Sequence, residues 1–385
     1  MRISPYALLS AGLLGRHEPA VSLATLSLNK VLQDASPVFG SYIKKTGARA
    51  EWMKRYPDHT KLVHMNIPGV HDSATWNYTQ ATQDKLLGVT NLGQAVVYDP
   101  RYFRCQDVSI VDALNSGIRA FDLRYALDVT NSSLVFFHAQ ALQSETATVE
   151  DVLFGFYQWL TDHPSETVML SFQYEGSTMP TAQNNAAVQL ALYNLLTSPA
   201  ARQFFVQTRG RLGTLGDARG KITLLRRFDL DQLPSSYEDA LPGLHFSPNR
   251  WTDNGADIAL QYNSANNLTA YVEDYYNPTT DIGSSAEENI RWKYNATTAH
   301  ISKAIEPQYR NDLFWTWASS ENVGNLPPDF PEIQALGNGT AYTPSGGVNL
   351  QLVPFLKDLK GKRVGILMLD FFEQPSELLD TFLGL

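Results

Sequence analysis

The chain contains a single cysteine, Cys105, among 385 residues, which excludes an internal disulfide framework and a cysteine-based zinc site. Basic residues are also in deficit, because 30 Lys and Arg face 39 Asp and Glu for a net charge of -9. Nucleic-acid binders more often carry a basic excess, and electrostatic docking on anionic membranes relies on polybasic segments. We therefore expect no nucleic-acid partner, and we interpret Cys105 as a small buried hydrophobic residue.

Long apolar runs are absent as well, since none reaches the ~18 residues that a membrane span requires. The N-terminal sequence MRISPYALLSAGLLGRHEP pairs Arg2 with a short apolar stretch, which is typical of a weak secretory signal or of a short amphipathic helix. Sequons for N-glycosylation occur at Asn77, Asn131, Asn267, Asn295 and Asn338. These features predict a secreted glycoprotein in which residues 1–50 form an N-terminal extension or processed segment.

Segments of strand length, rich in β-branched and aromatic residues, recur along the chain. They lie at 61–67, 118–125, 133–139, 167–174, 221–228, 268–276, 313–319 and 363–372. Helical patterns occupy 146–164, 181–199, 284–305 and 349–362, whereas 77–104 and 230–265 have the composition of long surface loops. Strands that alternate with helices and are apolar throughout favour a parallel sheet. The prediction is a distorted TIM-type α/β barrel over residues 51–385 as a single domain, with a doubly wound sheet as the alternative.

Polar residues collect at the ends of these predicted strands, where a barrel of this kind carries its chemistry. They are His71, Asp72, Asp122, Arg124, His138, Glu175, Arg226, Arg227, Asp274, Tyr276 and Asp370. His71 and Asp72 follow a Pro68-Gly69 turn that we expect to end the first strand. Residues two apart in a strand share a face, so Asp122 should lie beside Arg124.

Two histidines that face one site can act as base and acid in one reaction. A guanidinium between them would hold a phosphate, and carboxylates would orient the imidazoles. These ingredients fit the cleavage of a phosphodiester by an internal nucleophile. Arg124 stands two residues after Asp122, where a metal site would need another carboxylate. We therefore expect neither a metal ion nor another cofactor.

Six segments together resemble one enzyme family, and they occur in its order from about Trp52 to the C-terminus. They are IPGVHDSATW, GIRAFDLRY, HPSETVMLSFQYE, GDARGKITLLRRF, VEDYY and KRVGILMLDFF. The sequence is similar to the phosphatidylinositol-specific phospholipase C X-domain family, in its bacterial-type, metal-independent branch. The resemblance implies a distorted TIM barrel that cleaves phosphatidylinositol or glycosyl-phosphatidylinositol lipids. The implied products are diacylglycerol and inositol 1,2-cyclic phosphate.

The resemblance also implies a role for individual residues. His71 matches the general base for the inositol 2-hydroxyl, with Asp370 as its carboxylate partner, and His138 matches the general acid, supported by Asp72. Arg124 matches the residue that binds the phosphate. The implied substrate-binding residues are Asp122, Gln173, Arg227, Asp274 and Tyr276, with Tyr276 stacked under the sugar ring. Gln173 stands where the bacterial enzymes have a lysine, and Ala139 stands where a glycine usually follows the acid histidine.

Two other functions stay open at this point. One is a related phosphodiesterase for another phospholipid or a glycerophosphodiester; the other is a barrel that binds lipid head groups without turnover, which the neutral Gln173 would favour. The expected partner is a phospholipid substrate, reached by a monomer through transient contact with a membrane surface. Because the net charge is acidic, that contact should use apolar or aromatic residues, for which Trp76 and Trp251 are candidates.

Overall fold

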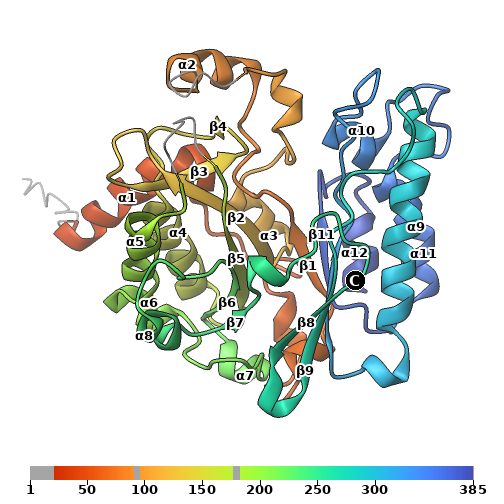
Figure 1. The fold of residues 1–385 in the computed structure, drawn as a ribbon. Coiled ribbons are helices and arrows are strands. Elements are labelled where there is room, and N and C mark those ends of the chain that lie inside the picture. The colour runs from red at the N-terminus through yellow and green to blue at the C-terminus, as the bar shows by residue number, and fades with distance from the viewer. Residues whose placement is uncertain (1–20, 91–95, 177–182, 385) are drawn as a thin grey trace, which may run out of the picture.

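The computed structural model describes residues 21–90, 96–176 and 183–384. Its centre is one large mixed sheet with helices along its outer side (Figure 1). The strands are β1 (Ile67–Val70), β2 (Ala120–Leu127), β3 (Leu134–His138), β4 (Ala141–Leu142), β5 (Val168–Tyr174), β6 (Ile222–Arg227), β7 (Leu244–His245), β8 (Ile258–Asn263), β9 (Leu268–Glu273), β10 (Leu313–Trp317) and β11 (Ile366–Leu369). Within the described ranges, no helix is both long and apolar enough to cross a bilayer.

The strand order shows a barrel. Along the sheet the order is β7-β6-β5-β2-β1-β11-β10-β9-β8. Neighbours from β7 to β9 run parallel, and only β8 is antiparallel to its neighbour β9. Among the described residues no strand pairing joins β7 to β8, so the barrel is distorted and stays open there. The predicted TIM-type α/β class is confirmed.

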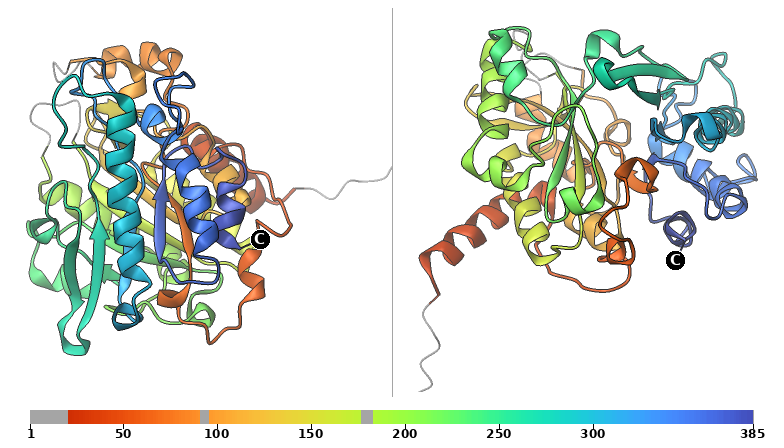
Figure 2. Two further views of the ribbon diagram at one scale, coloured as in Figure 1. Left: turned by 90° about the vertical axis from the view of Figure 1, so that its right-hand side faces the viewer. Right: turned by 90° about the horizontal axis from the view of Figure 1, so that it is seen from below.

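Helices lie along opposite outer sides of the barrel, as Figure 2 shows from two further directions. They are α1 (Leu23–Phe39), α2 (Gln80–Thr90), α3 (Ile110–Ser116), α4 (Val149–Asp162), α5 (Ala186–Leu196), α6 (Pro199–Phe204), α7 (Leu215–Ala218), α8 (Ser235–Ala240), α9 (Ala286–Ala304), α10 (Pro331–Leu336), α11 (Val348–Asp358) and α12 (Leu378–Leu383). The four predicted helical segments correspond to α4, α5, α9 and α11. Thr148 caps α4 by accepting a hydrogen bond from the backbone of Asp151, as its position before an apolar run predicts.

The N-terminal helix α1 packs on the barrel. Its residues Ala35, Val38 and Phe39 are fully buried, and the Phe39 ring meets the Phe156 ring of α4 edge to face at 5.4 Å. The predicted boundary at residue 50 stays a prediction, and the predicted secretory signal lies in residues 1–20, outside the described part of the chain.

The first strand was predicted in the wrong place. Residues 62–64 form a 3₁₀ turn, and β1 begins only at Ile67 and runs through Pro68 and Gly69. Pro68 has no backbone N–H to donate, but its carbonyl still accepts a hydrogen bond from the Arg119 amide at 2.9 Å. Gly69 fits because a Cβ there would lie 2.4 Å from the Met368 sulfur. The Pro-Gly pair therefore permits close packing inside the strand instead of ending it, and the turn comes at His71 and Asp72.

Three further predictions about the topology need correction. The segment 133–139 forms β3 but pairs antiparallel with β2. It is therefore a hairpin strand beside the barrel and not one of the barrel strands. Its place in the barrel is taken by β7, which lies in the predicted loop 230–265 together with α8 and β8. The predicted loop 77–104 contains α2. Very short strands such as β7 leave almost no periodic signal in a sequence.

Candidate active site

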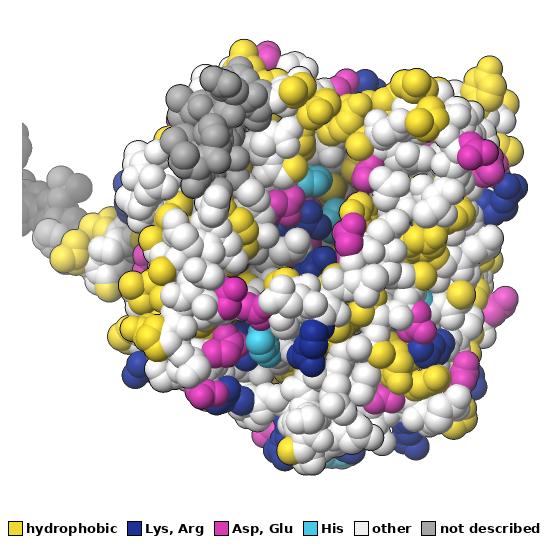
Figure 3. All heavy atoms as spheres, in the orientation of Figure 1, with side chains coloured by type: hydrophobic (Ala, Val, Ile, Leu, Met, Phe, Trp, Pro, Cys, Tyr) yellow, Lys and Arg dark blue, Asp and Glu magenta, His cyan; other side chains and the backbone are white. Residues whose placement is uncertain are grey.

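A pocket of about 300 Å³ opens at the carboxyl ends of the parallel strands. Its lining consists of His71, Tyr102, Arg124, His138, Gln173, Glu175, Arg227, Asp253, Asp274, Tyr276, Ser319, Ser320, Glu321, Pro331 and Asp370. Figure 3 shows the hollow at the middle of this face, with histidine, basic and acidic side chains gathered in it. Every predicted site residue lines this pocket except Asp72 and Asp122, which are fully buried.

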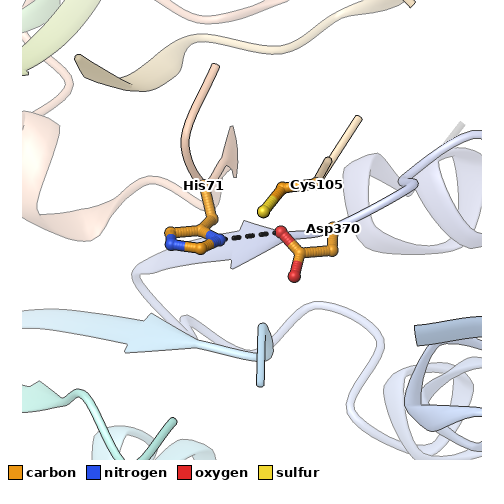
Figure 4. Close-up of side chains that lie close together, drawn as sticks. All are labelled: His71, Cys105 and Asp370. Atoms are coloured by element: carbon orange, nitrogen blue, oxygen red, sulfur yellow. Dashed lines mark hydrogen bonds and ion pairs between the residues drawn. The ribbon is translucent and has the colours of Figure 1, made fainter. Parts of the chain in front are cut away.

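His71 and Asp370 meet because their strands are neighbours. Val70 and Leu369, the last residues of β1 and β11, are partners in the parallel register. The residues that directly follow these strand ends are His71 and Asp370. His71 Nδ1 lies 2.9 Å from Asp370 Oδ1 (Figure 4). Two residues 299 positions apart are thus adjacent by sheet register.

The hydrogen bonds of His71 define its protonation state. Arg124 Nη2 donates to His71 Nε2 at 2.6 Å, and a guanidinium can only donate. His71 Nε2 is therefore an acceptor, and the ring proton is on Nδ1, where it is donated to Asp370. Burial lowers the pKa of His71 well below its usual value, and the positive charge of Arg124 lowers it further. Burial raises the pKa of Asp370 well above its usual value.

His138, the last residue of β3, faces His71 across the pocket. Their ring centroids lie 6.3 Å apart. His138 Nδ1 lies 2.9 Å from the Phe103 carbonyl and 3.1 Å from Asp72 Oδ2, which leaves Nε2 for the pocket. Burial lowers the pKa of His138, although the negative charge of Glu175 opposes that shift. The sequence neighbours His71 and Asp72 therefore contact different partners.

Arg124 has a partner for each guanidinium nitrogen. Beside the contact with His71, its Nε lies 3.1 Å from Asp122 Oδ2 and its Nη1 lies 2.9 Å from Glu175 Oε2. Asp122 also accepts a long hydrogen bond of 3.4 Å from the Asp72 amide. Because Asp122 lies buried beneath Arg124, it is placed to orient the guanidinium and not, as predicted, to contact a substrate.

Glu175 was predicted to lie at a strand end, but no role was assigned to it. It follows β5 directly, and its other carboxylate oxygen accepts a hydrogen bond of 2.5 Å from the amide of Ala139. The charge of Arg124 holds the pKa of Glu175 below its usual value. Glu175 therefore joins the guanidinium to the backbone next to His138. Only the strand-end position pointed to it in the sequence.

The opposite side of the pocket is built around Asp274. Its Oδ2 accepts hydrogen bonds from Arg227 Nη2 and from Trp251 Nε1, each at 2.7 Å. The Arg227 guanidinium lies over the Trp251 ring, 3.9 Å from the centroid. Tyr276 Oη donates to Asp253 at 3.1 Å. An arginine, a carboxylate and an aromatic ring thus border one end of the pocket.

The two tryptophans predicted for membrane contact differ in burial. Trp251 is only 9% exposed beneath Arg227. Trp76 is half-buried, and its indole N–H donates to the Val38 carbonyl at the end of α1 at 2.8 Å. Burial and a hydrogen bond to Asp274 hold Trp251 inside, which corrects its prediction, whereas membrane contact by Trp76 stays a prediction.

Cys105 is buried, as predicted, but it lies next to both histidine–carboxylate pairs, His71–Asp370 and His138–Asp72. Its sulfur is 4.0 Å from His138 Nδ1, and Figure 4 shows it beside His71 and Asp370. Burial and the nearby carboxylates raise the pKa of the Cys105 thiol well above its usual value. Two groups that contain this thiol, His71–Cys105–Asp370 and Asp72–Cys105–His138, are close enough for shared metal ligation, but a protonated thiol is a poor ligand.

The fold and pocket define an α/β barrel with paired histidines around an arginine. Residues 94–228 match the sequence profile described as phosphatidylinositol-specific phospholipase C, X domain. The chain is 23% identical over 337 residues to the 1-phosphatidylinositol phosphodiesterase of Listeria monocytogenes, covering 87% of this chain and 84% of that one. It is 31% identical over 126 residues to human PI-PLC X domain-containing protein 1, covering 30% of this chain and 38% of that one.

Solved structures agree in fold. The phosphatidylinositol-specific phospholipase C of Staphylococcus aureus superposes with a TM-score of 0.65 at 19% identity, covering 87% of this chain and 98% of that one. The Listeria monocytogenes enzyme gives 0.58 at 21% identity, with the same coverage of each chain. The chain therefore matches the phosphatidylinositol-specific phospholipase C X domain over residues 94–228 and shares its fold with these bacterial enzymes.

Proposed function

We propose that this protein cleaves the phosphodiester of phosphatidylinositol or glycosyl-phosphatidylinositol lipids by attack of the inositol 2-hydroxyl. The products are diacylglycerol and inositol 1,2-cyclic phosphate. One observation carries the proposal: two histidines, each backed by a different carboxylate, face each other at 6.3 Å with Arg124 bonded to one of them. Relatives named 1-phosphatidylinositol phosphodiesterase support this choice of substrate.

The base side of the reaction uses His71. Its unprotonated Nε2 accepts the proton of the 2-hydroxyl as that oxygen forms its bond to phosphorus. The Nδ1 proton stays on the ring, and Asp370 stabilises the resulting imidazolium. Arg124 Nη2, which donates to His71 in the free protein, turns to the phosphate oxygens and disperses their developing charge.

The acid side uses His138. Protonated at Nε2, it gives that proton to the glycerol oxygen as the bond between this oxygen and phosphorus breaks. The Phe103 carbonyl and Asp72 hold Nδ1 and fix the ring. Arg227 and Asp274 hydrogen-bond to the inositol hydroxyls, and Tyr276 stacks against the ring. Gln173, between Arg124 and Arg227 in the β2-β5-β6 register, is placed to donate to a phosphate oxygen.

The proposed reaction needs no metal ion. The Arg124 guanidinium lies 2.6 Å from His71, so a fixed positive charge already stands where the phosphate would bind. A nearby divalent cation would be repelled by this charge. The protein works as a monomer that touches the lipid surface transiently, and its sequons and N-terminal sequence support secretion.

The test is product analysis with purified protein, phosphatidylinositol and excess chelator. We expect inositol 1,2-cyclic phosphate, with both His71→Ala and His138→Ala reducing turnover by at least 10³-fold, on the order of the effect of removing one member of an acid–base unit. His64→Ala, on the 3₁₀ turn before β1, is the matched control. Full loss of activity in chelator would refute the metal-free mechanism. Binding of inositol phosphate without turnover would favour a head-group-binding barrel, and turnover restricted to other phosphodiesters would change the substrate.

A further inference from the structure

A second pocket, larger than the catalytic one, lies beside it. It has a volume of 770 Å³, within the ~300–1,000 Å³ range of small-molecule sites. Its apolar wall is formed by Tyr102, Pro327, Pro328, Phe330, Ile333 and Tyr342, and we call it the rim groove. Tyr102 lines both pockets, so the rim groove and the catalytic pocket are adjacent, with Tyr102 at their border.

The rim groove opens on the side of the general acid. Tyr102 precedes Phe103, whose carbonyl accepts from His138 Nδ1 and whose ring lies edge-on to that histidine at 5.9 Å. Arg227 and Asp274 lie at the other end of the catalytic pocket. A substrate with its inositol at Asp274 and its phosphate at Arg124 therefore directs its glycerol oxygen, and the chains beyond it, toward Tyr102.

The polar groups around the rim groove are already engaged by the protein. Arg101 donates to Asp99 at 3.0 and 2.7 Å and lies 4.3 Å from the centre of the Phe330 ring. Asp329 accepts from Asn289 at 2.6 Å. The groove thus has little to offer a charged ligand. It suits an apolar one, because burying a polar group without a hydrogen bond is costly.

The surface around the rim groove is unusually apolar for a protein in water. Tyr342 is 79% exposed and Leu326 is 70% exposed. Figure 3 shows hydrophobic side chains gathered above the hollow, over the region of the 3₁₀ turn Pro100–Tyr102 and α10. Exposed apolar patches of this kind mark binding surfaces.

We propose that the rim groove binds the acyl chains of the diacylglycerol half of the substrate, so that the protein takes up single lipid molecules with their chains held against Ile333 and Phe330. This inference rests on the proposed function. Each methylene that leaves water for the groove strengthens binding, by roughly fourfold when it is fully buried.

The test measures kcat/KM for dibutanoyl, dipentanoyl and dihexanoyl phosphatidylinositol below their aggregation concentrations. For the wild type we expect at least a twofold rise per methylene added to each chain. Ile333→Asp removes this rise, since a buried charge opposes apolar chains. Tyr342→Asp, at an exposed position, repeats the test without a risk to folding. Leu190→Asp, on the outer face of α5, is the matched control and keeps the rise.

Several outcomes would overturn the proposal. Equal kcat/KM for all chain lengths would show that the chains are not held, and a rise that survives both groove variants would place them elsewhere. A rise seen only above the aggregation concentration would assign the apolar rim to adsorption on a lipid surface. If no lipid is turned over, the proposed function fails. Dihexanoylglycerol binding by calorimetry then decides: binding weakened by Ile333→Asp supports the groove, and no binding refutes it.

Discussion

Replacing Arg124 with lysine keeps the positive charge but removes the shape of the guanidinium. In the structure three nitrogens of Arg124 contact Asp122, Glu175 and His71 at 3.1, 2.9 and 2.6 Å. A lysine ammonium is a point charge on a flexible stem and cannot keep all three. In the proposed mechanism, the donor to His71 is the one that turns to the phosphate. The loss of one positioned donor to a developing oxyanion costs about 3–4 kcal/mol, so kcat should fall by about 10²- to 10³-fold.

The assay follows inositol 1,2-cyclic phosphate by phosphorus NMR at saturating dihexanoyl phosphatidylinositol. The matched control is Arg226→Lys on β6, because Arg226 pairs with Glu238 at 2.6 Å and does not line the catalytic pocket. Thermal unfolding of both variants separates catalysis from stability. A kcat for Arg124→Lys within tenfold of the wild type, in a folded protein, would refute the role of the planar guanidinium.

Three further predictions concern the partners of these groups. Glu175→Gln removes the charge that raises the pKa of His138. Because the acid must be protonated, the alkaline limb of the pH profile of kcat/KM should move to lower pH, and an alkaline limb at the same or a higher pH contradicts this. Asp370→Asn should lower kcat on the order of 10³-fold, since an amide no longer fixes the proton on His71 Nδ1; phosphorus NMR checks it, and a loss under tenfold counts against the pairing. Gln173→Lys should raise kcat about fivefold, because a charge-assisted hydrogen bond to phosphate is roughly twice as strong as a neutral one; Gln173→Met supplies the uncharged comparison, and equal rates for both variants would dismiss Gln173 as a phosphate contact.

The sequence predicted the barrel because its long strands carry strong patterns. β2, β5, β6 and β10 are buried almost throughout and lie where expected. The prediction failed where a strand was too short to show a period, or where its residue pattern fits more than one kind of strand. A two-residue strand such as β7 has no period, and a hairpin strand such as β3 is as apolar as a barrel strand because it also packs on both sides. Pairing direction depends on the connection, which residue patterns alone do not reveal.

The site was easier to predict at its reactive groups than at their supports. His71, His138 and Arg124 stood out because polar side chains at the ends of apolar strands are costly without a purpose. The family resemblance implied a substrate contact for Asp122, but this residue is buried beneath Arg124 and is placed to orient the guanidinium. Glu175 showed only its strand-end position, and Cys105 showed no distinguishing pattern. Their importance follows from what lies within 4 Å of them, which only the fold determines.

The backbone explains why sequence neighbours serve different partners. Among the described residues, three non-glycine residues other than asparagine have positive φ, and they follow His71, His138 and Asp370: Asp72 at 41°, Ala139 at 49° and Phe371 at 44°. This left-handed conformation costs roughly 1–2 kcal/mol per residue. At Asp72 it turns the chain out of the β1 register, so that His71 stays beside Asp370 on β11 while Asp72 reaches His138. At Ala139 the amide points to Glu175. The strain falls where each strand ends at the pocket, and the buried ion pairs and hydrogen bonds around it hold the backbone in that form. Sheet register and these turns, more than distance along the chain, therefore assign each carboxylate to its histidine.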